Sequence, residues 1–418
     1  MRHTTPSATR DLLLIIGSGP APMQQYLLER AAADYPLLLI EDQPLTWQRP
    51  YVVDHEVVAD PTDPVALCAA ADALAARWPL AGVLTWSENH VLSTARLAER
   101  LGLSGNPPRA ALAARDKALG QQCFAAAGVP AAASTWVHSL DAAASAAERV
   151  GYPVVLKPAS HTGSIGVTRV DTIGDLPRSW DIATAAVAHQ GPEGQGALLQ
   201  EYLDGPEVSV ETVTYQGTTT AVALTRKTLG FAPHFLATAH SVTAEDPLLQ
   251  TVAPLAAQAL KALGITDGVS HVEMRFTVTG PRVIEVNARL AGDRIGDLVL
   301  RATGVDLPRA AAAIACGNAP DLQPTKRCSA AIGMLYPPAD GVVTTRHLTP
   351  GSTDEEEFHW LCDIGDHVTR TPSTTTPNNT RAGFAIVTGP TVGQAQQRLA
   401  DALARAEIEV QPAATPVA

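Results

Sequence analysis

Cysteine is scarce in this chain of 418 residues and shows no pattern of pairing. The five cysteines are Cys68, Cys123, Cys316, Cys328 and Cys362, and no two of them form a Cys-x-x-Cys motif. An odd number of scattered cysteines is typical of reduced cytosolic thiols and not of a disulfide framework. We therefore expect a cytoplasmic protein and exclude a disulfide-stapled secreted scaffold.

Long hydrophobic runs and an excess of basic charge are also missing. Only about six apolar residues precede Gly17, fewer than the core of a signal peptide needs, and no stretch approaches the ~20 apolar residues of a membrane span. Lys and Arg number 30 against 42 Asp and Glu, which gives a net charge of -12. A general nucleic-acid binder usually has a basic face. We expect neither a membrane nor a nucleic acid as partner.

The residues that are present predict a folded chain of several domains. Hydrophobic residues make up 46% of the sequence, which is ample for buried cores, while aromatic residues make up only 5%. A chain of this length exceeds one typical core and predicts about two to four domains. Stretches of strand and helix character follow one another along it, so the expected class is α/β and α+β multidomain.

The first clear pattern is a βαβ unit near the N-terminus. An apolar strand at residues 11–16 leads into a glycine turn, a helix is expected near residues 23–33, and a second strand ends at Glu41. A nicotinamide-dinucleotide-dependent oxidoreductase could begin in this way, with Glu41 on a ribose. Against that class, Pro22 stands where the fingerprint has its third glycine. This alternative, like that of a non-catalytic binding module, stays open at this point.

A second pattern places acidic and amide side chains on a β-hairpin. Residues 271–289 read as two short strands joined by a Gly-Pro turn. Alternation along a strand puts Glu285, Asn287 and Arg289 on one face, and the turn can bring Glu273 beside them. Mg²⁺ favours such oxygen ligands and usually takes only one or two protein carboxylates, with substrate phosphates completing its shell. The hairpin therefore predicts a magnesium and phosphate site.

A third pattern is a lysine followed by a glycine-rich loop. An apolar strand ends at Lys157, and residues 163–166 read Gly-Ser-Ile-Gly before another strand begins. Glycines allow close backbone approach, successive N–H groups form an anion-binding concavity, and the lysine can add a point charge. The loop is not a P-loop, because the Gly-x-x-x-x-Gly-Lys-Ser/Thr motif is absent.

Two further segments complete the set. Residues 197–213 form an apolar strand, a Gly-Pro turn and an alternating strand, so the backbone leaving the first strand could pair with an adenine edge and Glu207 could accept from ribose hydroxyls. Lys117 begins a helical pattern that ends in Ala-Gly-Val-Pro. Each segment alone is ordinary, but the order of all four is specific.

That order resembles the ATP-grasp superfamily over about residues 11–320. Within this span, the segments around Lys227, His240, His271 and residues 287–293 are most similar to the bacterial L-amino-acid ligases that make dipeptides, a branch that also contains carnosine-synthase-type enzymes. The resemblance implies an ATP-grasp fold with an N-terminal Rossmann-like pre-ATP-grasp domain, a lid subdomain and a C-terminal α+β lobe.

The resemblance also implies a role for each matching residue. Arg289 would stabilise the phosphoryl group in flight and the anionic intermediate, and Mn²⁺ could replace Mg²⁺. The predicted residues are, for ATP, Lys117, Lys157, Gly163, Ser164, Gly166, Gln200, Glu201, Tyr202, Leu203 and Glu207; for the metal, Glu273, Glu285 and Asn287; for catalysis, Lys157, Arg289 and Arg294; and for the substrates, Glu88, Lys227, His240, His271 and Arg294.

The chain departs from this branch at positions that bear on the substrate. Ala237 and Ala239 stand where dipeptide-forming relatives commonly have Glu and Gly before the histidine. A missing carboxylate removes a partner for a substrate ammonium group. Arg294 is a cation where a neutral residue is common, and it could receive a carboxylate bidentately. We therefore also consider glutamate as the substrate, with its γ-carboxyl activated and its α-carboxylate on Arg294.

The implied reaction joins two L-amino acids into a dipeptide. ATP transfers its γ-phosphoryl group to a carboxylate, an amine attacks the acyl phosphate, and ADP and phosphate are released. A ligase for another carboxylate or amine is the alternative within the superfamily. No residue stands out as the base for the amine, although Glu88 and His271 are candidates. The resemblance favours a homodimer.

Domain boundaries follow from composition and from the resemblance. Asn106-Pro-Pro108 predicts the first boundary, and a loop is expected at residues 371–380. The expected divisions are 1–105 for the N-terminal domain, 106–133 for a linker and helix, 134–204 for the lid, 205–320 for the catalytic core and 321–418 for the C-terminal lobe.

Overall fold

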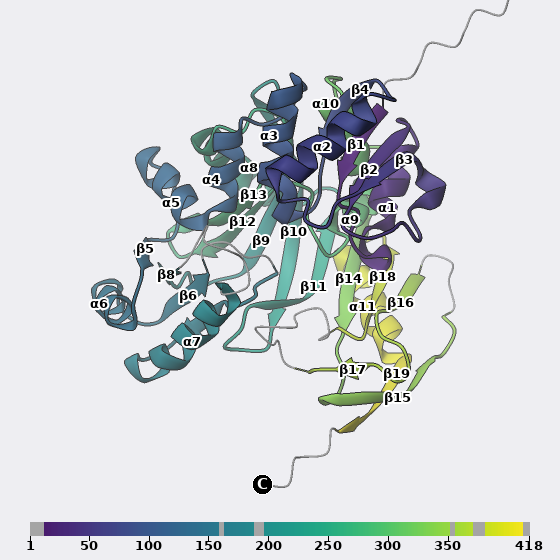
Figure 1. Ribbon diagram of the computed structural model, residues 1–418. Coiled ribbons are helices and arrows are strands. Elements are labelled where there is room, and N and C mark those ends of the chain that lie inside the picture. Colours follow the sequence, from purple (N-terminus) through teal and green to yellow (C-terminus); the bar gives the residue numbers. More distant parts are fainter. Residues whose placement is uncertain (1–11, 159–162, 188–195, 352–355, 371–380, 413–418) are drawn as a thin grey trace, which may run out of the picture.

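The computed structural model describes residues 12–158, 163–187, 196–351, 356–370 and 381–412 (Figure 1). The predicted loop at residues 371–380 lies outside this part of the chain. No helix among the described residues is both long and apolar enough to cross a membrane.

The N-terminal part of the described chain forms a parallel sheet with helices on both faces, as the βαβ pattern predicts. The strand order is β3-β2-β1-β4. Every residue of β1 and β2 is buried, because α1 covers one face while α2 and α3 cover the other. The elements are β1 (Leu12–Ile16), α1 (Ala21–Ala32), β2 (Leu37–Glu41), β3 (Val52–Val57), α2 (Pro64–Ala75), β4 (Leu80–Leu84) and α3 (Val91–Leu101).

A second sheet of four strands lies at the lower left of Figure 1, with two helices beside it. Its order is β5-β8-β6-β7, and neighbouring strands are antiparallel. Ala143, Ala146 and Ala147 of α6 pack on these strands, with Leu140 at the edge of the same cluster. The elements are β5 (Ser134–Val137), α6 (Leu140–Val150), β6 (Val154–Pro158), β7 (Thr168–Val170), α7 (Leu176–Val187) and β8 (Ala197–Glu201).

An antiparallel sheet of eight strands forms the centre of the molecule, in the order β13-β12-β9-β10-β11-β14-β18-β16. Strand β9 is buried along nearly its whole length, since α8 and α10 both pack against it. The elements of the first half are α4 (Pro108–Arg115), α5 (Lys117–Ala126), β9 (Glu207–Tyr215), β10 (Thr218–Gly230), β11 (Leu236–Thr243), α8 (Leu249–Leu263), β12 (Gly268–Thr277), β13 (Gly280–Asn287), α9 (Ile295–Thr303) and α10 (Leu307–Ala315).

The same sheet continues past the boundary predicted at residue 320. Strand β11 pairs with β14 from residues 239 to 243, and β14 pairs with β18 along its whole length. The last strands therefore share a hydrogen-bonded sheet with the core, and only a three-stranded sheet, β17-β15-β19, stands apart. The elements are β14 (Ser329–Leu335), β15 (Gly341–Leu348), β16 (Glu356–Trp360), β17 (His367–Val368), β18 (Gly383–Gly389), α11 (Val392–Ala404) and β19 (Ala406–Pro412).

Candidate functional site

A cavity of about 670 Å³ collects most of the predicted site residues. Its walls come from the start of α1, from β6 and the loop after it, from the end of β8, from the central sheet, and from the start of β18. The predicted residues that line it are Lys117, Lys157, Gly163, Ser164, Gly166, Gln200, Glu201, Tyr202, Leu203, Glu207, Lys227, His240, His271, Glu273, Glu285, Asn287 and Arg289. Segments far apart in sequence therefore meet at one site.

Two lysines converge on one carboxylate oxygen. Glu285 Oε2 lies 3.4 Å from Lys117 Nζ and 3.8 Å from Lys157 Nζ. Lys157 is buried on β6, and burial lowers its pKa although Glu285 acts in the opposite direction. Two ammonium groups that converge in this way can attract an anion such as a phosphate.

The loop after Lys157 has the backbone that the glycines predict. Gly163, Ser164 and Gly166 have φ values of 66°, 57° and 73°, and all three line the cavity. A Cβ at Gly166 would approach Pro158 to 2.8 Å, so only glycine fits there without a shift. This turn can present backbone N–H groups to phosphate oxygens.

The segment that leaves β8 lies on the opposite wall. Gln200 Nε2 donates to Ser134 Oγ at 2.9 Å, and the Tyr202 ring has the Arg169 guanidinium 4.4 Å from its centroid. Arg275 Nη1 donates to the Leu203 carbonyl at 3.0 Å. Glu201 is tied to Arg282 at 2.7 Å, so its side chain is held by an ion pair beside the cavity.

Glu207, predicted to meet a ribose, is already held by two cations. Arg275 donates to Glu207 Oε2 from Nε at 3.2 Å and from Nη2 at 3.1 Å, while Lys227 Nζ lies 3.6 Å from Glu207 Oε1. Burial lowers the pKa of Lys227, but Glu273 and Glu207 outweigh that effect and raise it above its ordinary value. Lys227 thus acts in this structure as a permanent positive partner of two cavity carboxylates.

Glu273 is fixed by a buried network that the sequence did not reveal. Lys227 and His271 both donate to Glu273 Oε1, the histidine from Nε2 at 3.1 Å. His271 Nδ1 lies 2.9 Å from an oxygen of Glu211, a fully buried carboxylate that also accepts from Ser209 Oγ. Burial opposes protonation of the imidazole, yet Glu211 and Glu273 raise the pKa of His271 to about 9. No motif pointed to Glu211, because it looks like any polar residue in an alternating strand.

The hairpin residues have the chemistry that Mg²⁺ requires. Glu273 and Glu285 are direct cross-strand partners in the β12–β13 ladder, and Asn287 follows Glu285 on the same face. The carboxylates of Glu273 and Glu285 and the amide oxygen of Asn287, which accepts from Arg289 Nη2 at 3.4 Å, are hard oxygens of the kind that Mg²⁺ prefers. Among the described residues no three His, Cys, Asp or Glu side chains form a self-sufficient metal site.

Arg289 lies at the end of this row and is held by the N-terminal domain. Its Nε donates to Glu88 Oε2 at 2.7 Å, with both side chains nearly buried. Arg115 Nη1 in turn donates to the Asn89 carbonyl at 2.6 Å. Glu88 is not among the residues that line the cavity. Its observed contact is with Arg289, so it orients a cavity residue where the sequence predicted direct contact with the substrate.

Arg294 requires a correction. It does not line the cavity. Its Nη2 donates to Asp297 Oδ2 at 2.7 Å and lies 3.8 Å from Glu357 Oε2, and the guanidinium stacks 5.0 Å from the centroid of Tyr26. A buried, ion-paired and stacked guanidinium is not placed to receive a substrate carboxylate. The geometry therefore gives no support to the predicted substrate role of this residue.

A cluster that sequence reasoning missed stands beside it. Arg381 donates to both oxygens of Asp293, from Nη1 at 2.5 Å and from Nη2 at 3.0 Å, and His240 Nε2 lies 3.0 Å from Asp293 Oδ2. All three residues line the cavity. Although burial acts in the opposite direction, the Arg381 guanidinium and the hydrogen bond with His240 hold the pKa of Asp293 far below its usual range. Arg381 precedes β18, so only the shared sheet brings it here.

The dinucleotide alternative loses its key residue. The Ser18 N–H donates to Glu41 Oε1 at 2.5 Å, so Glu41 closes the first glycine turn. In this structure Glu41 therefore stabilises the turn through one of its oxygens. Gly19 is also packed against Gln24, whose amide would collide with any added Cβ.

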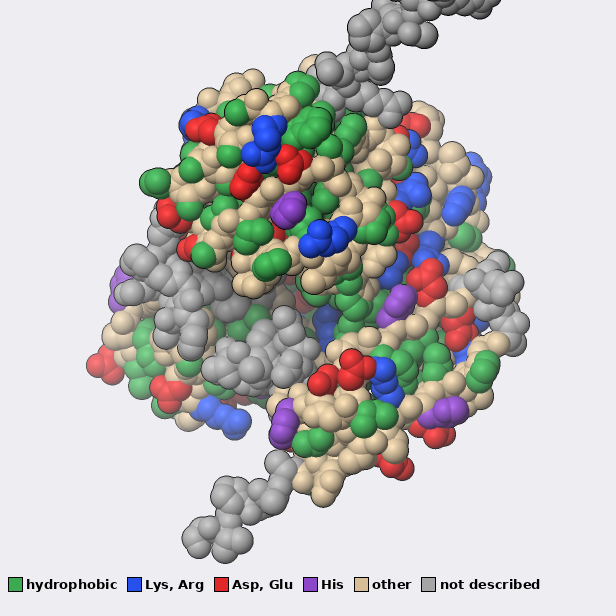
Figure 2. Space-filling view, turned by 45° about the vertical axis from the view of Figure 1, so that its right-hand side comes forward, with side chains coloured by type: hydrophobic (Ala, Val, Ile, Leu, Met, Phe, Trp, Pro, Cys, Tyr) green, Lys and Arg blue, Asp and Glu red, His purple; other side chains and the backbone are tan. Residues whose placement is uncertain are grey.

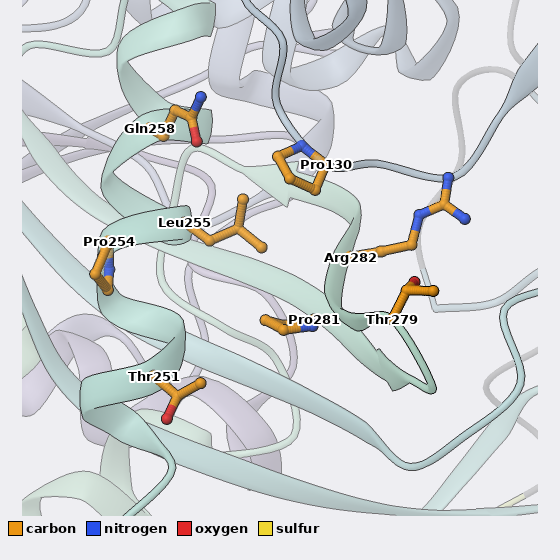
Figure 3. Close-up of a pocket in the computed structure, with 8 residues that line it drawn as sticks. All are labelled: Pro130, Thr251, Pro254, Leu255, Gln258, Thr279, Pro281 and Arg282. Atoms are coloured by element: carbon orange, nitrogen blue, oxygen red, sulfur yellow. The ribbon is translucent and has the colours of Figure 1, made fainter.

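A second cavity, of about 590 Å³, lies between α8 and the β12–β13 hairpin. Figure 3 shows Leu255 and Pro281 facing each other across it, with Pro130 and Pro254 at its sides. No carboxylate lines it, and the predicted site residues lie elsewhere. On the face shown in Figure 2, acidic and basic side chains are interspersed among hydrophobic ones, and no continuous basic surface appears.

Comparison with known proteins defines the class. Residues 150–297 match the model of the ATP-grasp domain. The crystal structure of an L-amino acid ligase from Bacillus licheniformis superimposes with a TM-score of 0.79 over 97% of this chain and all of the other, at 19% identity. The chain therefore contains an ATP-grasp domain within an ATP-grasp fold, and the resemblance inferred from its sequence is confirmed.

Its curated relatives are more specific. Carnosine synthase 1 of Mus musculus is 28% identical over 337 residues, which are 74% of this chain and 40% of that protein. Alanine–anticapsin ligase of Bacillus subtilis is 27% identical over 258 residues, which are 56% of this chain and 53% of that protein. The chain thus has homologues among ATP-grasp ligases and spans about half or less of the length of these two relatives.

Proposed function

We propose that this protein is an ATP-dependent carboxylate–amine ligase that joins two L-amino acids into a dipeptide. A carboxylate is a poor electrophile, so the γ-phosphoryl group of ATP would first be transferred to it. The resulting acyl phosphate is attacked by the amine of the second amino acid, and ADP and phosphate leave. The homologous carnosine synthase and alanine–anticapsin ligase support this reaction class.

One observation carries the proposal. Lys117 and Lys157 meet Glu285 at the wall of a cavity that also contains Asn287 and Arg289. This row offers cations and hard oxygens along one line, which is the charge pattern needed by a phosphoryl group moving from a nucleotide to a carboxylate. The glycine turn at residues 163–166 adds N–H donors above the same line.

Each group has a distinct task in this scheme. Lys157 and Lys117 bind phosphate oxygens, and the turn at residues 163–166 covers them and keeps water away from the acyl phosphate. Arg289, oriented by Glu88, stabilises charge on the transferring phosphoryl group and on the oxygen of the intermediate. Mg²⁺, held by Glu273, Glu285 and Asn287, would supply charge neutralisation between the phosphates; Mn²⁺ has similar ligand preferences.

The mode of substrate activation is part of the proposal. Activation of the α-carboxyl group is favoured over γ-glutamyl transfer, because Arg294, the residue expected to hold the glutamate α-carboxylate, is outside the cavity. Both substrates are small molecules. We also propose that the protein is a homodimer and that its chain divides into the five domains predicted from the sequence.

The decisive experiment measures ADP and phosphate release from Mg²⁺-ATP in a matrix of amino-acid pairs, with the products identified by mass spectrometry. We expect release that needs two particular amino acids and a product lighter than their sum by one water. ATP binding without stimulation by any pair would redirect the search to another carboxylate or amine. If the protein bound NAD(P) without Mg²⁺ and did not bind ATP, the result would support the oxidoreductase alternative instead.

A further inference from the structure

Asp293 differs from the other acidic residues of the main cavity in its position. Glu207, Glu273 and Glu285 lie among the lysines and Arg275 on the side where phosphates would bind. Asp293 lies beyond Arg289, in the turn that connects β13 to α9. It lines the same cavity as Arg289, so a substrate whose carboxylate meets Arg289 shares this space with Asp293.

The backbone at this point is strained. Asp293 has a φ of 51° and Arg294 a φ of 55°, two consecutive non-glycine residues in the left-handed region. A non-glycine residue in this region is strained and persists only where its surroundings fix it. Here Arg381, which precedes β18, and His240 of β11 fix the carboxylate of Asp293 from two other segments. Strain that is held by three segments is often associated with a functional position.

The carboxylate has capacity left for a ligand. Three donors reach it, two from Arg381 and one from His240, whereas a carboxylate has about four acceptor positions. The side chain of Asp293 remains 21% exposed, and it lines the cavity. Since His240 is itself almost fully buried, it holds Asp293 without reaching far into the open space.

The walls next to this carboxylate are apolar. Met23 of α1, Ile295 at the start of α9 and Leu361 after β16 all line the same cavity. The Leu361 N–H donates to the carbonyl of Ala382, the neighbour of Arg381, which places Leu361 close to the Asp293 cluster. A carboxylate beside an apolar surface can bind a molecule that carries a cationic group next to an apolar side chain.

We propose that Asp293 binds the ammonium group of the amino acid whose carboxylate is activated, and that Met23, Ile295 and Leu361 receive an apolar side chain of that amino acid. The inference rests on the proposed ligase function and names the substrate class of its first site. Arg381 and His240 are positioning residues that aim Asp293. The ammonium stays protonated, as it should on a substrate whose own nitrogen is not the nucleophile.

The first test needs only the wild-type protein. ATP-dependent ADP release is compared for an apolar L-amino acid, such as leucine, and for the carboxylic acid of the same skeleton without the amino group, with the accepting amino acid constant. The lost charge-assisted hydrogen bond predicts a kcat/KM for the des-amino acid that is about 100-fold lower. Equal use of the two acids overturns the inference.

The second test uses Asp293→Asn, with Asp246→Asn as the matched control. Asp246 is a buried aspartate with its own bidentate arginine, Arg226, at 2.7 and 3.0 Å, outside the cavity. D293N should lose most of the preference for the amino acid over its des-amino analogue, while its affinity for ATP is unchanged. D246N should keep the preference.

The outcomes separate the two proposals. A wild-type protein that releases no ADP with any amino-acid pair overturns the ligase function, and the inference falls with it. Wild-type activity together with full preference retained in D293N overturns the inference alone. If D293N does not fold, the wild-type comparison still decides, and Asp293→Glu serves as the second variant, which should retain the preference at a higher KM.

Discussion

Glu285 is the residue on which the phosphate side of the site depends. Its Oε2 is the shared partner of Lys117 and Lys157. In Glu285→Gln the two ammonium groups lose their counter-ion and a metal ligand disappears, but their attraction for phosphates grows. We therefore expect kcat to fall by about 10²–10³-fold while the KM for ATP changes little.

Steady-state kinetics of ADP release checks this expectation, with Glu56→Gln as a control on an exposed ion pair with Arg77. A variant whose kcat stays near that of the wild type would show that Glu285 does not take part in the chemical step.

Glu357 predicts a pH dependence of stability. The His359 hydrogen bond and Arg301 outweigh burial and lower the pKa of Glu357 to about 2. A carboxyl group with a folded pKa below its unfolded value stabilises the fold fully above about pH 4.5 and loses this contribution as pH falls toward 2. Because the side chain is 39% exposed, solvent screening limits the contribution to about 1 kcal/mol.

Chemical denaturation between pH 6 and pH 2.5 tests this for wild type and Glu357→Gln. The free energy of unfolding of the variant should be lower by about 1 kcal/mol at pH 6, and the difference should become steadily smaller as the pH falls below about 4.5 toward 2.5. A difference that is constant across this range would assign the effect to packing instead of charge.

At the scale of elements, the turn between β8 and β9 depends on one glycine. Gly205 has a φ of 127°, and a Cβ there would lie 1.9 Å from the carbonyl oxygen of Phe276. Gly280 has a similar φ of 112°, but nothing lies within 4 Å of its added Cβ. Alanine at either position destabilises the fold, because the backbone there has a positive φ. Only Gly205→Ala also requires β12 or the turn to shift.

We expect Gly280→Ala to lower the free energy of unfolding by about 1 kcal/mol and Gly205→Ala by roughly 2–4 kcal/mol. Gly205→Ala should also weaken ATP binding, because the turn follows the segment at residues 200–203 that lines the cavity. Urea titration and nucleotide calorimetry measure the two effects. Equal destabilisation by both variants would contradict the role of the Phe276 carbonyl.

Local elements were largely predictable from the sequence, because local patterns determine them. The helix expected near residues 23–33 is α1, and the helical pattern that begins at Lys117 is α5. The hairpin of β12 and β13 followed from alternation. Gly163 and Gly166 were recognisable because glycine is the residue that most often occupies positions with a positive φ.

Non-local pairing was not predictable in the same way. Nothing in residues 329–389 announces that β14 and β18 would extend the core sheet. Arg381 therefore escaped notice, as did the pairing of Arg294 with Asp297 in place of a substrate. Glu211 was not recognised for a related reason. In the sequence, a glutamate in an alternating strand looks the same whether its side chain is exposed or is buried beside a histidine.

At the scale of the whole molecule, ligand binding should be visible as stability. Parts of the N-terminal domain, the β5–β8 sheet and the central sheet all line one cavity. A ligand that binds only this folded arrangement adds about 2.7 kcal/mol to the free energy of unfolding at a concentration 100 times its Kd.

We expect Mg²⁺-ATP to raise the Tm of the wild type and to have a much smaller effect on Lys157→Met, which lacks a buried phosphate-binding charge. Calorimetric scans of both proteins, with and without the nucleotide, measure this difference. An equal rise in Tm would mean that ATP binds away from Lys157.

The eight-stranded sheet has a consequence for how this molecule can be divided. If the chain were cut at the boundary near residue 320, β11 would become an open edge, because β14 is its hydrogen-bonded neighbour. An exposed edge strand invites association with other chains. That edge carries His240, so recombination that exchanged the last hundred or so residues for those of a relative would redraw one wall of the site. Exchange of this segment would therefore change both the substrate selectivity and the solubility of the protein.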